Sequence, residues 1–77
     1  MDHSTRSGRS PELLAALCRQ LVDLAKHEED AAAAEASRTP YWSPCPSSVG
    51  GHRLAARLLR ERAAGLEAEA RSWALAS

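Results

Sequence analysis

The stretch RTPYWSPCPSSVGG, residues 38–51, divides the chain into two long segments of very different character from its own. It holds three of the four prolines and two of the three aromatic residues. A proline forces the residue before it out of the α-helical region, and Pro40, Pro44 and Pro46 follow one another closely. We therefore expect a stiff linker over residues 38–47 that ends one helix and precedes another.

Upstream of this linker, the pattern predicts a helix over about 11–37. Ser10 is a good N-cap, Pro11 suits the first helical position, and neither Gly nor Pro follows until Pro40. Leucines recur at a helical spacing and are expected to form the face that packs against the second helix. That face comprises Leu14, Leu17, Leu21, Leu24, Glu28, Ala31 and Glu35.

Downstream, a second helix is predicted over about 48–76, capped by Ser47 or Ser48. Gly50 and Gly51 are poor helix formers, so its first turn is expected to be irregular. Apolar residues recur at alternating spacings of four and three, which is a heptad pattern of alternating small and large side chains. This row comprises His52, Ala56, Leu59, Ala63, Leu66, Ala70, Trp73 and Ser77.

Charge predicts how the two helices are arranged. The second half of the first helix is acidic, and the first half of the second helix is rich in arginine. A short linker between two long helices favours an antiparallel helical hairpin, which brings those two halves together. The predicted fold class is therefore all-α, with a disordered tail over residues 1–9 and a single helical-hairpin domain over 10–77.

The size and composition predict that the hairpin does not stand alone. The chain has 77 residues, no Phe and 4% aromatic residues, and much of its hydrophobic content is alanine. A domain of this length buries only about 60% of its unfolded surface, so its core is marginal. We expect a homodimer in which two hairpins form a four-helix bundle, because that arrangement covers both apolar faces.

Several functional classes are disfavoured by the composition. The formal net charge is zero, with ten Lys and Arg against ten Asp and Glu, which disfavours a general nucleic-acid or membrane-surface binder. No apolar run has the length of a signal peptide core or a membrane-spanning helix, so the expected location is the cytoplasm. Cys18 and Cys45 are expected to be reduced there.

The candidate site for a protein partner combines the linker with the apolar row of the second helix. Tyr41 and Trp42 are expected to cover the open end of the bundle, and the alternative is an exposed ring that forms a binding hot spot together with the prolines. The candidate partner-binding residues are Tyr41, Trp42, Pro44, Pro46, Leu59, Leu66 and Trp73.

Two alternatives remain open at this stage. Arg53, Arg57 and Arg60 form a basic stripe that could meet phosphates in a nucleic-acid-associated protein. His27, Cys45 and His52 could hold a metal that stabilises the hairpin, although they lack the usual zinc-ligand spacing. No catalytic constellation can be assembled, so we expect a small, non-enzymatic protein–protein interaction or adaptor protein that needs no cofactor.

Overall fold

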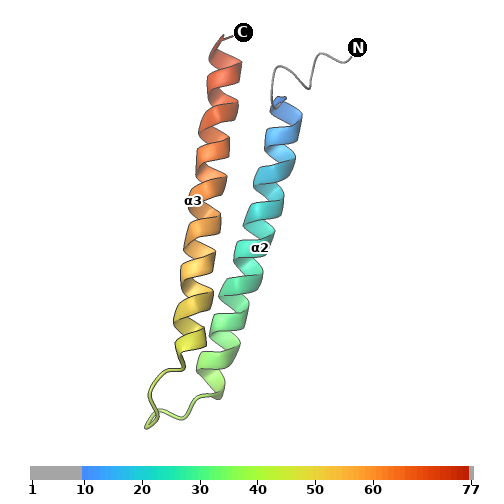
Figure 1. Ribbon diagram of the computed structural model, residues 1–77. Coiled ribbons are helices and arrows are strands. Elements are labelled where there is room, and N and C mark those ends of the chain that lie inside the picture. Colours follow the sequence, from blue (N-terminus) through green and yellow to red (C-terminus); the bar gives the residue numbers. More distant parts are fainter. Residues whose placement is uncertain (1–9, 77) are drawn as a thin grey trace.

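The computed structural model describes residues 10–76 and consists of two long helices joined by a linker (Figure 1). Helix α2 spans Pro11–Arg38 and helix α3 spans Ser47–Ala76, and the described part of the chain contains no strand. The helices pack side by side in opposite directions, which confirms the antiparallel hairpin. The tail predicted over residues 1–9 lies outside the described residues, as does Ser77.

Helix α2 begins and ends where the sequence predicts. The Ser10 hydroxyl accepts a hydrogen bond from the Leu13 amide at 3.2 Å, and Pro11 opens the helix. At the other end, Thr39 has the extended backbone that a following proline imposes. Its hydroxyl donates to the Glu35 carbonyl at 2.9 Å, which satisfies one of the free carbonyls of the last turn.

Helix α3 starts differently from the prediction in two respects. Its first turn is regular α-helix from Ser47 through Gly50 and Gly51, so the expected irregularity is absent. The Ser48 hydroxyl does not cap α3, because it donates to the Glu35 carboxylate of α2. Pro46 directly precedes the helix, and its carbonyl accepts a hydrogen bond of 3.0 Å from the Val49 amide.

The two helices meet along a seam made mostly of small side chains. On α3 the predicted row is confirmed from His52 to Ala70, since Ala56, Ala63 and Leu66 are buried and the other three members are half-buried. Trp73, the next member, is exposed, and Ser77 lies outside the described residues. Val49 extends this row by one position at the linker end and is fully buried.

The predicted packing face of α2 is wrong in part. Leu14 is fully buried and Leu21 half-buried, but the seam continues through Cys18, Ala25 and Ala32. Leu24 is 49% exposed. Both rows fit a helical period, and the one with alanines allows the two backbones to approach more closely.

The register of the hairpin follows from contacts across the seam. The Cys18 thiol donates to the Ala63 carbonyl at 3.2 Å, and Glu28 meets His52 at 2.6 Å. Residues therefore lie level with each other when their numbers add up to about 80. The hairpin measures 60 × 25 × 14 Å, so it is a long slab only one helix layer thick.

Candidate protein-interaction site

The linker carries an exposed pair of aromatic rings at the tip of the hairpin. Tyr41 is 94% exposed and Trp42 is 74% exposed. Their ring centroids lie 5.2 Å apart, and the rings meet edge to face. The expectation that these rings cover the open end is therefore wrong within one chain. Pro44 and Pro46, which flank Cys45, are exposed beside them.

Other side chains close the end of the hairpin and make the rings unnecessary there. Val49 fills the space between the helices. His52 of α3 pairs with Glu28 of α2 through its Nδ1 atom, and Ser48 donates to Glu35. These cross-helix contacts hold the two linker-proximal turns together. The prolines then carry residues 40–46 away from the helices, with both rings in solvent.

The remaining predicted partner-binding residues lie along α3. Leu66 is 4% exposed and Leu59 is half-buried, so both pack in the seam of the single hairpin. Trp73 lies near the end of α3 and remains 38% exposed. The structure thus separates the predicted set into tip residues in solvent and helix residues that mainly hold the hairpin together.

One flank of the hairpin is strongly charged. Arg60 binds Glu29 with two hydrogen bonds, of 2.7 and 2.8 Å, across the helix pair. The Arg60 hydrogen bond lowers the pKa of Glu29 below its ordinary value, and Lys26 contributes to the same effect. Arg57 lies 4.0 Å from Glu61 on the same helix. Two of the three arginines in the predicted stripe, Arg57 and Arg60, therefore already have acidic neighbours within the chain.

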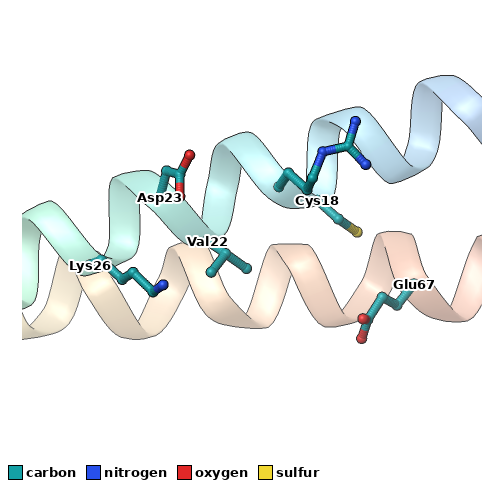
Figure 2. A pocket seen from close by; sticks show the side chains of 6 residues that line it. Cys18, Val22, Asp23, Lys26 and Glu67 are labelled. Carbon is teal, nitrogen blue, oxygen red and sulfur yellow. The ribbon is translucent and has the colours of Figure 1, made fainter.

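A shallow groove of about 350 Å³ lies between the helices on this charged flank (Figure 2). Cys18 and Val22 point from α2 toward α3, while Asp23 points away (Figure 2). Arg19, Lys26 and Glu67 also line the groove. It is open to solvent and is lined by charges of both signs.

The residues considered for a metal site are not brought together. Cys45 is exposed in the linker, His27 is exposed on α2, and His52 faces Glu28. Within residues 10–76, no group of three or more His, Cys, Asp and Glu side chains lies close enough to hold a metal ion. Both cysteines are free thiols.

The opposite flank carries a leucine face that sequence analysis did not identify. Leu17 and Leu24 directly precede the seam residues Cys18 and Ala25, whereas Glu29 directly follows the seam residue Glu28. Since each residue turns the helix by about 100°, the two leucines lie on the flank opposite Glu29. The leucine row of α2 was visible in the sequence. It indicates an exposed apolar face only when the seam is known to run through the neighbouring row of alanines.

Helix α3 contributes to this leucine face from the same side. Leu58 lies on that flank, nearly level with Leu24, and is 53% exposed. Arg62 and Glu69 lie on the same flank, and their opposite charges leave it neutral. We define the leucine face as Leu13, Leu17, Leu24, Ala55 and Leu58.

Comparisons with protein-family models, with curated proteins and with solved structures found no match to this chain. Among the described residues, neither helix combines the length and the apolar character needed to cross a bilayer.

Proposed function

We propose that this chain is a small, non-enzymatic protein–protein interaction module. It self-associates through its helices and presents the aromatic tip of the hairpin to a protein partner. One observation carries the proposal: the hairpin buries mostly small side chains in its own seam and leaves several large apolar ones in solvent. Ala25, Ala32, Ala56 and Ala63 are buried, while Tyr41, Trp42 and several leucines are exposed.

The tip suits recognition of a partner for reasons of conformational entropy. Tyr and Trp supply large contact areas with few rotatable bonds, and both are enriched at binding hot spots. The edge-to-face contact between Tyr41 and Trp42 restricts both rings before any partner arrives. Pro44 and Pro46 stiffen the backbone beside them, so less freedom is lost on binding.

The module acts in the cytoplasm in this proposal. Cys45 is a free thiol that is exposed in the linker. An accessible unpaired cysteine suits a reducing compartment, since an oxidising one favours disulfide formation.

Site-specific photo-crosslinking tests the role of the tip. A photoreactive phenylalanine analogue is placed at Trp42, or as a control at Ala64, which is exposed on α3. In the cells that make the protein, we expect a discrete protein adduct from position 42 that is absent from position 64. The Tyr41→Ala substitution should weaken that adduct. Equal crosslinking from both positions would count against the tip as a recognition site.

Sedimentation equilibrium tests self-association. We expect a dimer at micromolar concentration, because a hairpin one layer thick leaves its leucines uncovered. A folded species that remains monomeric up to millimolar concentration would contradict this part of the proposal.

A further inference from the structure

We propose that the leucine face is the surface on which a second copy of this chain packs, and that the charged flank stays in solvent. This inference rests on the proposed self-association and specifies its surface. The hairpin offers two broad flanks to a second copy. They differ sharply in chemistry, so the structure distinguishes between them.

The leucine face has the apolar pattern of a helix in a four-helix bundle. Such a helix is apolar at the two seam positions and along one adjacent flank. In α2 the adjacent apolar positions are Leu17, Leu24 and Ala31, each directly before a seam residue. The corresponding positions on the other flank include Glu29, which is held by Arg60. Helix α2 is therefore built to contact a third helix on the leucine side.

The exposure of these leucines is not relieved by anything within the described chain. Leu13 and Leu24 are each about half exposed, and Leu58 is 53% exposed. Leu24 and Leu58 come from different helices and lie nearly level on the same flank of the hairpin. Covering both at once requires an occupant that spans both helices.

A second copy fits this surface in area and charge. The broad side of the hairpin that carries this face extends over about 60 by 25 Å, and a second copy covering roughly half of that side would reach the ~800 Å² per partner of a standard protein interface. Arg62 and Glu69 give the flank no net charge, and the whole chain is neutral, so two copies do not repel each other. Packing two one-layer slabs also produces the two-layer core that stable domains have.

A matched pair of leucine substitutions tests the assignment. Leu24→Glu places a charge in the leucine face, whereas Leu75→Glu places the same charge on the outer side of α3, away from that face. The two leucines are 49% and 88% exposed, so both variants should retain the hairpin fold. Because a symmetric dimer contains each change twice, we expect Leu24→Glu to raise the dimer dissociation constant by about 100-fold or more. Leu75→Glu should change it by less than about threefold.

A measurement on the unaltered protein supports the variants. A soluble paramagnetic agent broadens the NMR signals of exposed methyl groups. On concentrating the protein, the methyl groups of Leu17 and Leu24 should become protected, while those of Leu75 remain accessible. This result does not depend on whether Leu24→Glu folds.

The outcomes separate the two proposals. If the wild-type protein stays monomeric, the proposal of self-association is itself wrong. A wild-type dimer whose affinity is unchanged by Leu24→Glu, with no protection of Leu24, overturns the leucine face and leaves self-association standing. Equal disruption by Leu75→Glu would also overturn the assignment, because it would place the contact on the outer side of α3.

Discussion

At the scale of single residues, alanine determines how closely the helices approach. Ala25 and Ala32 of α2 and Ala56 and Ala63 of α3 are all at most 5% exposed. Because a methyl side chain is small, the two backbones can lie close together. The Cys18 thiol consequently reaches the Ala63 carbonyl of the other helix. Larger side chains at these positions would have no room without separating the helices.

This closeness predicts that added bulk destabilises the seam. We expect Ala56→Leu to lower the free energy of unfolding by about 1–3 kcal/mol, because overpacking forces the backbones apart. Ala64→Leu is the matched control, since Ala64 is exposed, and it should change stability by less than about 0.5 kcal/mol. Urea unfolding at one protein concentration measures both. Equal effects would show that the seam does not pass through Ala56.

The ion pair of Glu29 and Arg60 predicts a titration. Arg60 lowers the pKa of Glu29 in the folded chain, so the pair stabilises the fold above the unfolded pKa of about 4.5. That contribution is lost as the pH falls through the lower, folded value. We expect Arg60→Gln to raise the pKa of Glu29 toward its ordinary value, measured by NMR of the side-chain carboxyl. Added salt should reduce the difference, because the pair is exposed.

At the scale of elements, the sequence predicted α3 better than α2. In α3 a single row alternates small and large residues, so only one face could form the seam. In α2 the row through Leu17 and Leu24 and the row through Cys18 and Ala25 both have helical spacing. Periodicity does not show which of two neighbouring rows faces a partner, because that choice depends on how closely the other helix approaches.

The candidate site was predictable in composition but not in geometry. Tyr41 and Trp42 were identified from their place among prolines. Their exposure was not, since the direction of a linker side chain depends on local backbone angles rather than on any repeat. The leucine face was missed because two of its members, Leu17 and Leu24, had been assigned to the hairpin's own seam.

Helix α3 has a position where its stability can be raised. Gly50 lies in regular helix, and a Cβ added there would have nothing within 4 Å. We therefore expect Gly50→Ala to increase the free energy of unfolding by about 0.5–1 kcal/mol, because alanine loses less backbone entropy on folding. Thermal or urea unfolding measures the gain. A loss of stability would indicate that the first turns of α3 are not helical in solution.

At the scale of the whole molecule, a dimer of two hairpins packed face to face is expected to be no longer than one hairpin. One hairpin is 60 Å long, and packing through the leucine face adds to its 14 Å thickness. Small-angle scattering of the dimer should therefore give a maximum dimension close to that of one hairpin. A value near twice that length would mean end-to-end contact, for example through the aromatic tips.

The hairpin topology also determines which residues lie at each end of the molecule. Ser10 and Ala76 lie together at one end, and Tyr41 and Trp42 lie at the other (Figure 1). A fluorescent reporter attached beside Ser10 or Ala76 would leave the aromatic rings unobstructed. Donor and acceptor dyes placed one beside Ser10 and the other beside Ala76 would lie within range for efficient energy transfer, and separation of the two helices would be seen as a loss of that transfer.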